Sequence, residues 1–176
     1  MSIHIRQERP SDYPQVFHLI EAAFRQEKYS DKKEQFLVER LRSTDGFIPD
    51  LSLLAEMDRQ VVGYVLLTEV KIATARDEVT ALALAPVAVL PAFQGKGIGA
   101  ALIEKAHTVA RDLGYQSVIL LGHERYYPRF GYRPLYEFGI SLPFEAPPEN
   151  CMALELVPDA LKNKAGKVIY PAAFFE

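Results

Sequence analysis

The chain has 176 residues, 49% of them hydrophobic and 24% charged, which suits a single domain over residues 1–176 with a substantial core. Its net charge of −3 at pH 7 argues against nucleic-acid binding and against a polybasic membrane-binding surface, because both need clustered lysine and arginine. The single cysteine, Cys151, excludes an intrachain disulfide, and the first residues show no apolar signal segment, so we expect a cytoplasmic protein.

The N-terminal part of the chain predicts a strand followed by a helix. Apolar and polar side chains alternate over residues 3–7, as they do in a half-buried strand. The helix that follows is expected to be capped by Ser11 or Asp12 and to carry Pro14 in its first turn.

A second helix and an antiparallel hairpin are predicted next. The helix is expected to begin at Asp31, with Glu34 at the spacing of a capping box, and to place Phe36 in the core. Residues 51–57 and 61–72 are rich in strand-forming side chains and are separated by a short polar turn, so they predict the hairpin.

A further strand is predicted over residues 79–90 and a strongly amphipathic helix over residues 98–113. Pro86 has no backbone N–H, so strand pairing is interrupted there and backbone groups are left for another partner. The helix ends at Gly114 as a C-cap, and His107 falls beside its apolar stripe, where we expect it to be at the surface.

The C-terminal third predicts a buried strand over residues 117–121, which completes a strand–helix–strand unit, and an irregular connection over residues 138–150. Two more strands are expected at residues 152–157 and 167–170. The apolar residues 170–175 are expected to cover the core.

Three glycines at alternating positions, Gly95, Gly97 and Gly99, precede the amphipathic helix. Their backbone N–H groups can converge on an anion at the positive end of the helix dipole, which predicts a phosphate site. A mononucleotide P-loop is set aside, since no hydroxyl follows Lys96 to reach magnesium. A dinucleotide site, formally matched through Ala100, and a turn without ligand stay open, although no acid follows the next strand to bind a ribose.

Residues 87–89 followed by residues 94–99 resemble the acyl-CoA signature Arg/Gln-x-x-Gly-x-Gly/Ala of the GNAT superfamily of N-acetyltransferases. Residues 127–132 resemble the family's Tyr-x-x-x-Gly-Phe element, and residues 121–131 look like its YhbS-like branch. The resemblance covers nearly the whole chain. It implies the GNAT fold, an α/β (α+β) arrangement in which a mixed, mostly antiparallel central sheet is flanked by helices.

The same resemblance implies that acetyl-CoA is the cosubstrate and that its acetyl group passes directly to an amine of an unidentified acceptor. If the binding residues are those of the signature, their backbone N–H groups would hold the pyrophosphate of the cofactor. Their backbone would also pair with the pantetheine arm, as an added strand does. These residues are Val87, Ala88, Val89, Gln94, Gly95, Lys96, Gly97, Ile98, Gly99 and Ala100.

The resemblance places Tyr127 as the acid that protonates the departing thiolate, because a phenol with an ordinary pKa of about 10 can share a proton with a thiol. The base stays open. Ala83 fills the position at which some family members carry a glutamate, so Glu34, Glu69, His123 or a water molecule is left for that role. A metal site is not expected, since no Cys/His pair has ligand spacing.

The missing acid at residue 83 keeps a second function open, that of a non-catalytic acyl-CoA-binding or sensing domain. The acceptor is either a small amine or a protein amine, and the sequence does not choose between them. Among macromolecular partners we consider a homodimer, and we expect neither nucleic acid nor a membrane.

Overall fold

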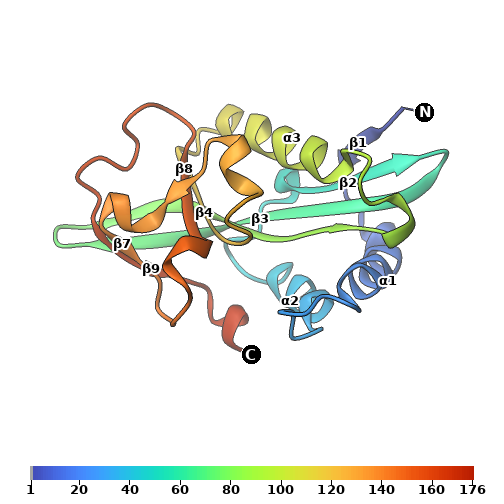
Figure 1. The fold of residues 1–176 in the computed structure, drawn as a ribbon, viewed down its shortest axis with the longest axis horizontal. Coiled ribbons are helices and arrows are strands. Elements are labelled where there is room, and N and C mark those ends of the chain that lie inside the picture. Colours follow the sequence, from blue (N-terminus) through green and yellow to red (C-terminus); the bar gives the residue numbers. More distant parts are fainter. Residues whose placement is uncertain (1) are drawn as a thin grey trace.

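The computed structural model describes residues 2–176, and within them it contains one nine-stranded sheet with helices on both faces (Figure 1). The strands are β1 (His4–Gln7), β2 (Ser52–Met57), β3 (Gln60–Thr74), β4 (Glu78–Val89), β5 (Ser117–Leu121), β6 (Arg133–Pro134), β7 (Ile140–Ser141), β8 (Cys151–Glu155) and β9 (Gly166–Ile169). The helices are α1 (Tyr13–Phe24), α2 (Glu34–Leu41) and α3 (Ile98–Asp112).

Short 3₁₀ segments join these elements, and the strands follow a simple order across the sheet. The segments are η1 (Pro10–Asp12), η2 (Pro49–Leu51), η3 (Pro91–Phe93), η4 (Tyr127–Phe130), η5 (Leu135–Phe138), η6 (Pro148–Asn150) and η7 (Ala172–Phe175). The strand order is β1-β2-β3-β4-β5-β8-β6, while β9 pairs with both β3 and β7. The β2–β3 hairpin is antiparallel and the β4–α3–β5 unit ends in a parallel pair, as the sequence predicts.

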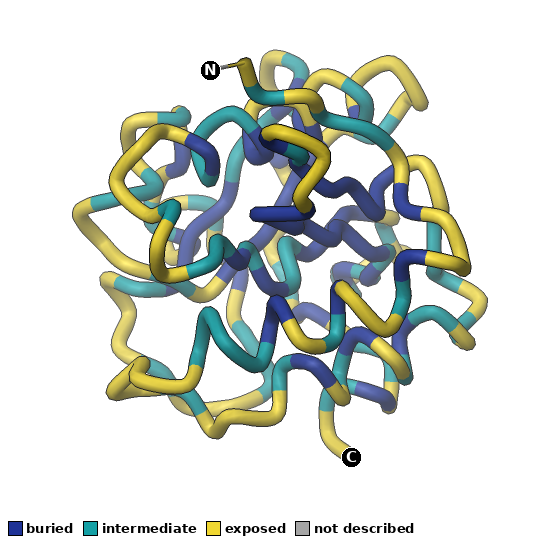
Figure 2. Tube along the Cα trace, turned by 90° about the vertical axis from the view of Figure 1, so that its right-hand side faces the viewer, coloured by how far each residue is buried: buried dark blue, intermediate teal, exposed yellow. Residues whose placement is uncertain are grey.

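Alternation along the strands divides the core between the two faces of the sheet. Leu53 and Val65 pack with α3, whereas Leu54 and Tyr64 pack with α1 and α2. The helices lie accordingly, with α3 on one face of the sheet and α1 and α2 on the other (Figure 1). The buried segments of the chain gather in the middle of the molecule (Figure 2). No helix within residues 2–176 combines the length and the apolar character needed to cross a membrane.

Helix α2 corrects two expectations of the sequence analysis. It begins at Glu34 rather than at Asp31, because Lys32 has a left-handed backbone with a φ of 64° that a helix cannot contain. Phe36 does not enter the core. Its side chain is 45% exposed and packs edge-on against Phe17 of α1, with ring centroids 5.4 Å apart.

Asp12 stands at the N-cap of α1, but its carboxylate makes no capping bond to that helix. It accepts two hydrogen bonds from the Arg6 guanidinium, at 2.8 and 2.9 Å, and one from the Arg9 backbone N–H at 2.7 Å. The Arg6 guanidinium lowers the pKa of Asp12 more than burial raises it. The side chain therefore ties β1 to the start of α1 instead of capping the helix.

The C-terminal segment covers the core in part. Ala173 is buried with α1 and α2, and its carbonyl accepts a hydrogen bond from Arg40 of α2 at 3.1 Å. Phe174 packs on the same cluster, whereas Phe175 is 60% exposed. Residues 170–175 are thus divided between core and surface, because a 3₁₀ turn directs successive side chains to different sides.

Candidate active site

The candidate site lies where two neighbouring strands separate. Within the described chain, β4 and β5 pair at Leu82 with Val118 and at Ala83 with Ile119, and the pairing does not continue beyond them. Strand β4 runs on to Val89 and keeps its other edge on β3. The β4 edge that faces β5 beyond residue 83 is therefore free for an extended ligand.

A bulge in β4 lies at the opening. The β3–β4 register shifts between the pair Val65 and Val87 and the pair Leu67 and Leu84, so β4 carries one residue more than β3 in this stretch. Pro86, which lacks a backbone N–H, falls inside it. The structure thus confirms the predicted interruption, and it places Val87, Ala88 and Val89 after the bulge.

The glycine turn follows β4 and opens α3. Gly95 and Gly97 have positive φ angles of 78° and 81°, and Gly97 is the N-cap of α3 without any side-chain capping bond. The first N–H groups of the helix therefore have no side-chain partner and can receive an anion. The Lys96 ammonium lies 5.7 Å from the centre of the Phe93 ring.

The other signature residues hold the turn against the sheet. The Gln94 side chain donates a hydrogen bond to the Val89 carbonyl at 3.1 Å, so this amide already occupies one backbone group that we expected a pantetheine arm to use. Ile98 is buried in the core, and Ala100 is half-buried beside it. A Cβ on Gly99 would lie 3.4 Å from the Tyr126 hydroxyl and within 4 Å of Val87 and Val89.

Tyr127 stands at the end of β5, next to the gap. Its ring packs directly on Gly122, where an added Cβ would collide with it, and Gly122 is held by two hydrogen bonds with Asn150, at 2.8 and 2.9 Å. The Tyr126 ring is 5.1 Å away and edge-on. Burial, with a smaller contribution from Tyr126, raises the pKa of Tyr127 to about 12, so its phenol keeps a proton at neutral pH.

His107 corrects a further expectation. It is 6% exposed, not at the surface, and its Nε2 lies 2.8 Å from the hydroxyl of the buried Tyr132. Burial, together with the nearby Arg111 charge, lowers the pKa of His107 to about 4, so the imidazole is neutral and can accept the Tyr132 proton in this bond. The Phe130 ring lies edge-on to the His107 ring, with centroids 6.4 Å apart. The rings of Phe130 and Tyr132 in turn pack against Tyr127.

The structure does not bring all the predicted catalytic residues together. The Glu69 carboxylate accepts a hydrogen bond of 2.5 Å from Tyr115, which precedes β5, whereas Tyr127 follows it. Since β5 has 5 residues, its two ends are about 13 Å apart along the strand. His123 is exposed in the turn before Tyr127, and its Nδ1 lies 3.4 Å from the Arg125 backbone nitrogen.

Glu34 lies on the opposite face of the sheet from α3. Its Oε2 accepts a hydrogen bond from the Ser30 hydroxyl at 2.5 Å, while its Oε1 is buried and has no partner within residues 2–176. The neighbouring Gln35 also has a buried, unpaired Oε1. In the described residues no group of three or more His, Cys, Asp or Glu side chains is placed to hold a metal ion.

Comparison with known proteins agrees with this geometry. The family model of the acetyltransferase (GNAT) domain matches residues 4–135. The chain belongs to the GNAT family. This GNAT protein is 38% identical over 119 residues to the uncharacterized N-acetyltransferase YjhQ of Escherichia coli, an alignment that spans 67% of this chain and 66% of YjhQ. It is 29% identical over 171 residues to the uncharacterized N-acetyltransferase YhbS of Escherichia coli, over 97% of each protein.

Two solved structures resemble this GNAT protein over nearly its whole length. A GNAT family acetyltransferase from Brucella melitensis, in complex with acetyl-CoA, has a TM-score of 0.81 and 37% identity and is matched over 98% of each chain. YhbS from Escherichia coli, in complex with CoA, has a TM-score of 0.86 and 25% identity over 99% of this chain and 92% of that one. These neighbours confirm the predicted family and the predicted mixed, mostly antiparallel fold.

Proposed function

We propose that this GNAT protein transfers an acetyl group from acetyl-CoA to an amine of its acceptor. The observation that carries the proposal is the gap between β4 and β5, flanked by the glycine turn that follows β4 and by Tyr127, which follows β5. Bound acetyl-CoA and CoA in the structures from Brucella melitensis and Escherichia coli support the identity of the donor. They favour coenzyme A over the dinucleotide that the glycine pattern leaves open.

The signature residues have distinct roles in holding the donor. The backbone N–H groups of Gly95 to Ala100 bind the pyrophosphate, where the turn and the dipole of α3 favour negative charge. The backbone of Val87 and Val89 pairs with the pantetheine amides along the free edge of β4. Binding then requires the Gln94 amide to leave the Val89 carbonyl or to share it.

The transfer exchanges one bond for another. The neutral amine nitrogen attacks the thioester carbonyl carbon, a C–N bond forms and the C–S bond breaks. Tyr127 gives its phenolic proton to the departing sulfur, and the proton lost by the amine passes to a base. The products are the N-acetylated acceptor and coenzyme A with a free thiol. A backbone N–H on the β4 edge stabilises the oxyanion.

We assign the base to Glu34, acting through water. Its free Oε1 is the support for this choice, since Glu69 is engaged with Tyr115 at the far end of β5 and His123 is exposed to solvent. Helix α2 lies on the face of the sheet away from α3, so a proton released there does not have to cross the bound donor.

A thermal-shift and turnover experiment tests the donor and the reaction together. Acetyl-CoA and CoA are expected to raise the Tm, and NAD is expected to leave it unchanged. Thiol release from acetyl-CoA should depend on an added amine. Stabilisation by acetyl-CoA without turnover of any amine would instead favour the non-catalytic binding domain, and stabilisation by NAD alone would contradict the proposal.

The proposal extends to location and assembly. We place the reaction in the cytoplasm, in keeping with the absence of clustered basic residues and of disulfide pairs in the sequence. The exposed Phe175 beside α2 offers a second copy of the chain an apolar contact. Light scattering at increasing protein concentration measures whether a homodimer forms.

A further inference from the structure

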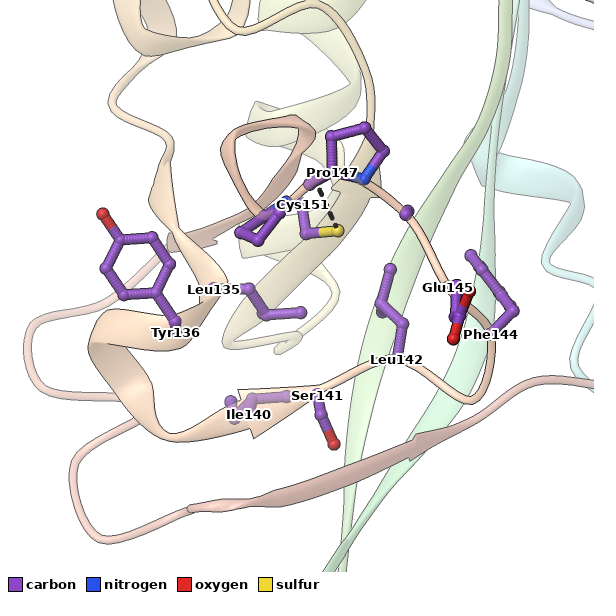
Figure 3. A pocket seen from close by; sticks show the side chains of 11 residues that line it. Leu135, Tyr136, Ile140, Ser141, Leu142, Phe144, Glu145, Pro147 and Cys151 are labelled. Atoms are coloured by element: carbon purple, nitrogen blue, oxygen red, sulfur yellow. Dashed lines mark hydrogen bonds between the residues drawn. The ribbon is translucent and has the colours of Figure 1, made fainter.

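A cavity of about 640 Å³ is lined by residues between Leu135 and Cys151, none of which belongs to the acyl-CoA signature. The connection between β6 and β8 forms most of its wall (Figure 3). Its volume is in the range of pockets that bind small molecules. Principal lining residues are Leu135, Ile140, Leu142, Phe144, Glu145 and Cys151.

The register of β5 and β8 places the cavity next to the gap. Cys151, which lines the cavity, pairs with Leu121, the last residue of β5. Side chains that are paired across an antiparallel ladder lie on the same face, so Leu121 stands beside Cys151. Leu121 is 48% exposed although it belongs to an otherwise buried strand. The cavity lining therefore lies next to the apolar side chain at the end of β5.

The cavity lies on the opposite face of the sheet from the donor site. Tyr127 packs in the cluster that includes α3, whereas Leu135, Ile140 and Cys151 pack in the cluster that includes Ala83. The two clusters face opposite sides of the sheet, and the gap between β4 and β5 connects them. A thioester placed in the gap is thus open to attack from the side of the cavity.

The lining determines which acceptor the cavity suits. Its walls are mostly aliphatic, proline and aromatic side chains, and of the residues that line it only Glu145 carries a charge. Figure 3 shows Tyr136 at one end and Phe144 with Glu145 at the other. Burial, and after it the charge of Glu149, raises the pKa of the Cys151 thiol, so a second carboxylate acts near the same opening.

We infer that this cavity binds the acceptor, and that the acceptor is a small monoamine with an apolar or aromatic body and a cationic amino group. The apolar body lies against Leu142 and Phe144, and Glu145 attracts the ammonium before it loses its proton. This inference rests on the proposed function. An additional carboxylate on the acceptor is disfavoured, because no lining residue carries a positive charge to pair with it.

Three probes with matched chemistry test the inference. They are 2-phenylethylamine, phenylalanine, which has the same aromatic body and an added carboxylate, and ethanolamine, which lacks the apolar body. With acetyl-CoA as donor, kcat/KM for 2-phenylethylamine is expected to exceed the values for the other two. Equal use of all three amines, or preference for a lysine-containing peptide over them, would overturn the inference.

Two variants of the cavity have controls elsewhere on the chain. Phe144→Ala and Glu145→Gln should each raise KM for 2-phenylethylamine about fivefold and leave KM for acetyl-CoA unchanged. Leu113→Ala and Glu78→Gln remove an exposed apolar side chain and an exposed carboxylate that do not line the cavity, and should change neither constant. Cavity variants that behave like the controls would contradict the assignment.

The only cysteine of the chain allows a test of acceptor binding that does not depend on turnover. Cys151 lines the cavity, so 2-phenylethylamine should slow its alkylation by iodoacetamide at least twofold, measured by mass spectrometry at about pH 9 to offset the raised pKa of the thiol, while ethanolamine should not. Unchanged alkylation would overturn the inference even if the enzyme is active. Conversely, protection of Cys151 without any thiol release from acetyl-CoA would support the cavity and contradict the proposed function.

Discussion

The two faces of the sheet meet at the gap between β4 and β5 but are built in different ways. On the α3 face, the proposed donor site uses backbone groups from one short stretch, Gln94 to Ala100, whose shape follows from positive φ angles at glycine. On the other face, the proposed acceptor cavity uses side chains spread over residues 135–151 in a mostly irregular connection. Backbone recognition suits a ligand that all relatives share, whereas side-chain recognition can change with each acceptor.

Loss of the Tyr127 hydroxyl is the largest effect we expect on the donor face. Tyr127→Phe should lower kcat roughly a hundredfold or more, because the leaving thiolate loses its proton donor. Acetyl-CoA affinity and Tm should change little, since the ring and its packing on Gly122 remain. Tyr126→Phe is the matched control and should retain most of its turnover. Full activity in Tyr127→Phe would contradict the assignment of Tyr127 as the acid.

The pH profile sharpens the same assignment. An acid must be protonated to act, and a pKa of about 12 keeps Tyr127 protonated throughout the usual assay range. The rate should therefore rise with pH as the amine and its base lose their protons, and it should not fall up to about pH 10. A decline in kcat between pH 8 and 10, with the fold intact, would point to a different acid.

The buried His107 on the donor face should make the stability of the fold depend on pH in the acid range. Unfolded histidine binds a proton below about pH 6.5, whereas folded His107 does so only near pH 4, so the unfolded state binds more protons between these values. Stability should fall as the pH drops through this window, by up to about 3 kcal/mol. Urea unfolding of His107→Gln should show a weaker dependence, while the exposed His18→Gln should behave like the wild type.

Two glycines at opposite ends of α3 separate binding from stability. Gly97 and Gly114 both have positive φ, 81° and 92°, and open space where a Cβ would be. Replacing either with alanine should destabilise the fold by a similar amount, about 1–2 kcal/mol. Acetyl-CoA should bind about tenfold more weakly only to Gly97→Ala, as measured by calorimetry. Equal affinities in the two variants would place the pyrophosphate elsewhere.

The smallest predicted effect concerns Gln35 on the other face. It is 4% exposed and its Oε1 has no partner within residues 2–176, so Gln35→Met should stabilise the protein by about 1 kcal/mol in urea unfolding. Gln26→Met, at an exposed position, is the control and should be neutral. A destabilised Gln35→Met would mean that the oxygen is hydrogen-bonded to water in solution, and would contradict the prediction.

Local patterns in the sequence were enough to predict the order of most elements and the signature turn. The alternation in β2 and β3, the stripe of α3 and the interruption at Pro86 each depend on residues within a few positions of one another. The errors at Phe36 and His107 have another origin. Periodicity places a side chain on one side of its own helix, but only the neighbouring elements decide whether that side is covered.

The sequence by itself determined the GNAT family and the glycine turn and predicted Tyr127 as the acid, because each is carried by short segments whose residue types and spacing are informative. Only the tertiary structure decided that Glu69 is paired with Tyr115 at the far end of β5, that His107 is buried under Tyr132, and that a cavity opens beside Leu121. These facts depend on strand register and on contacts between residues far apart in the chain, which no local pattern encodes.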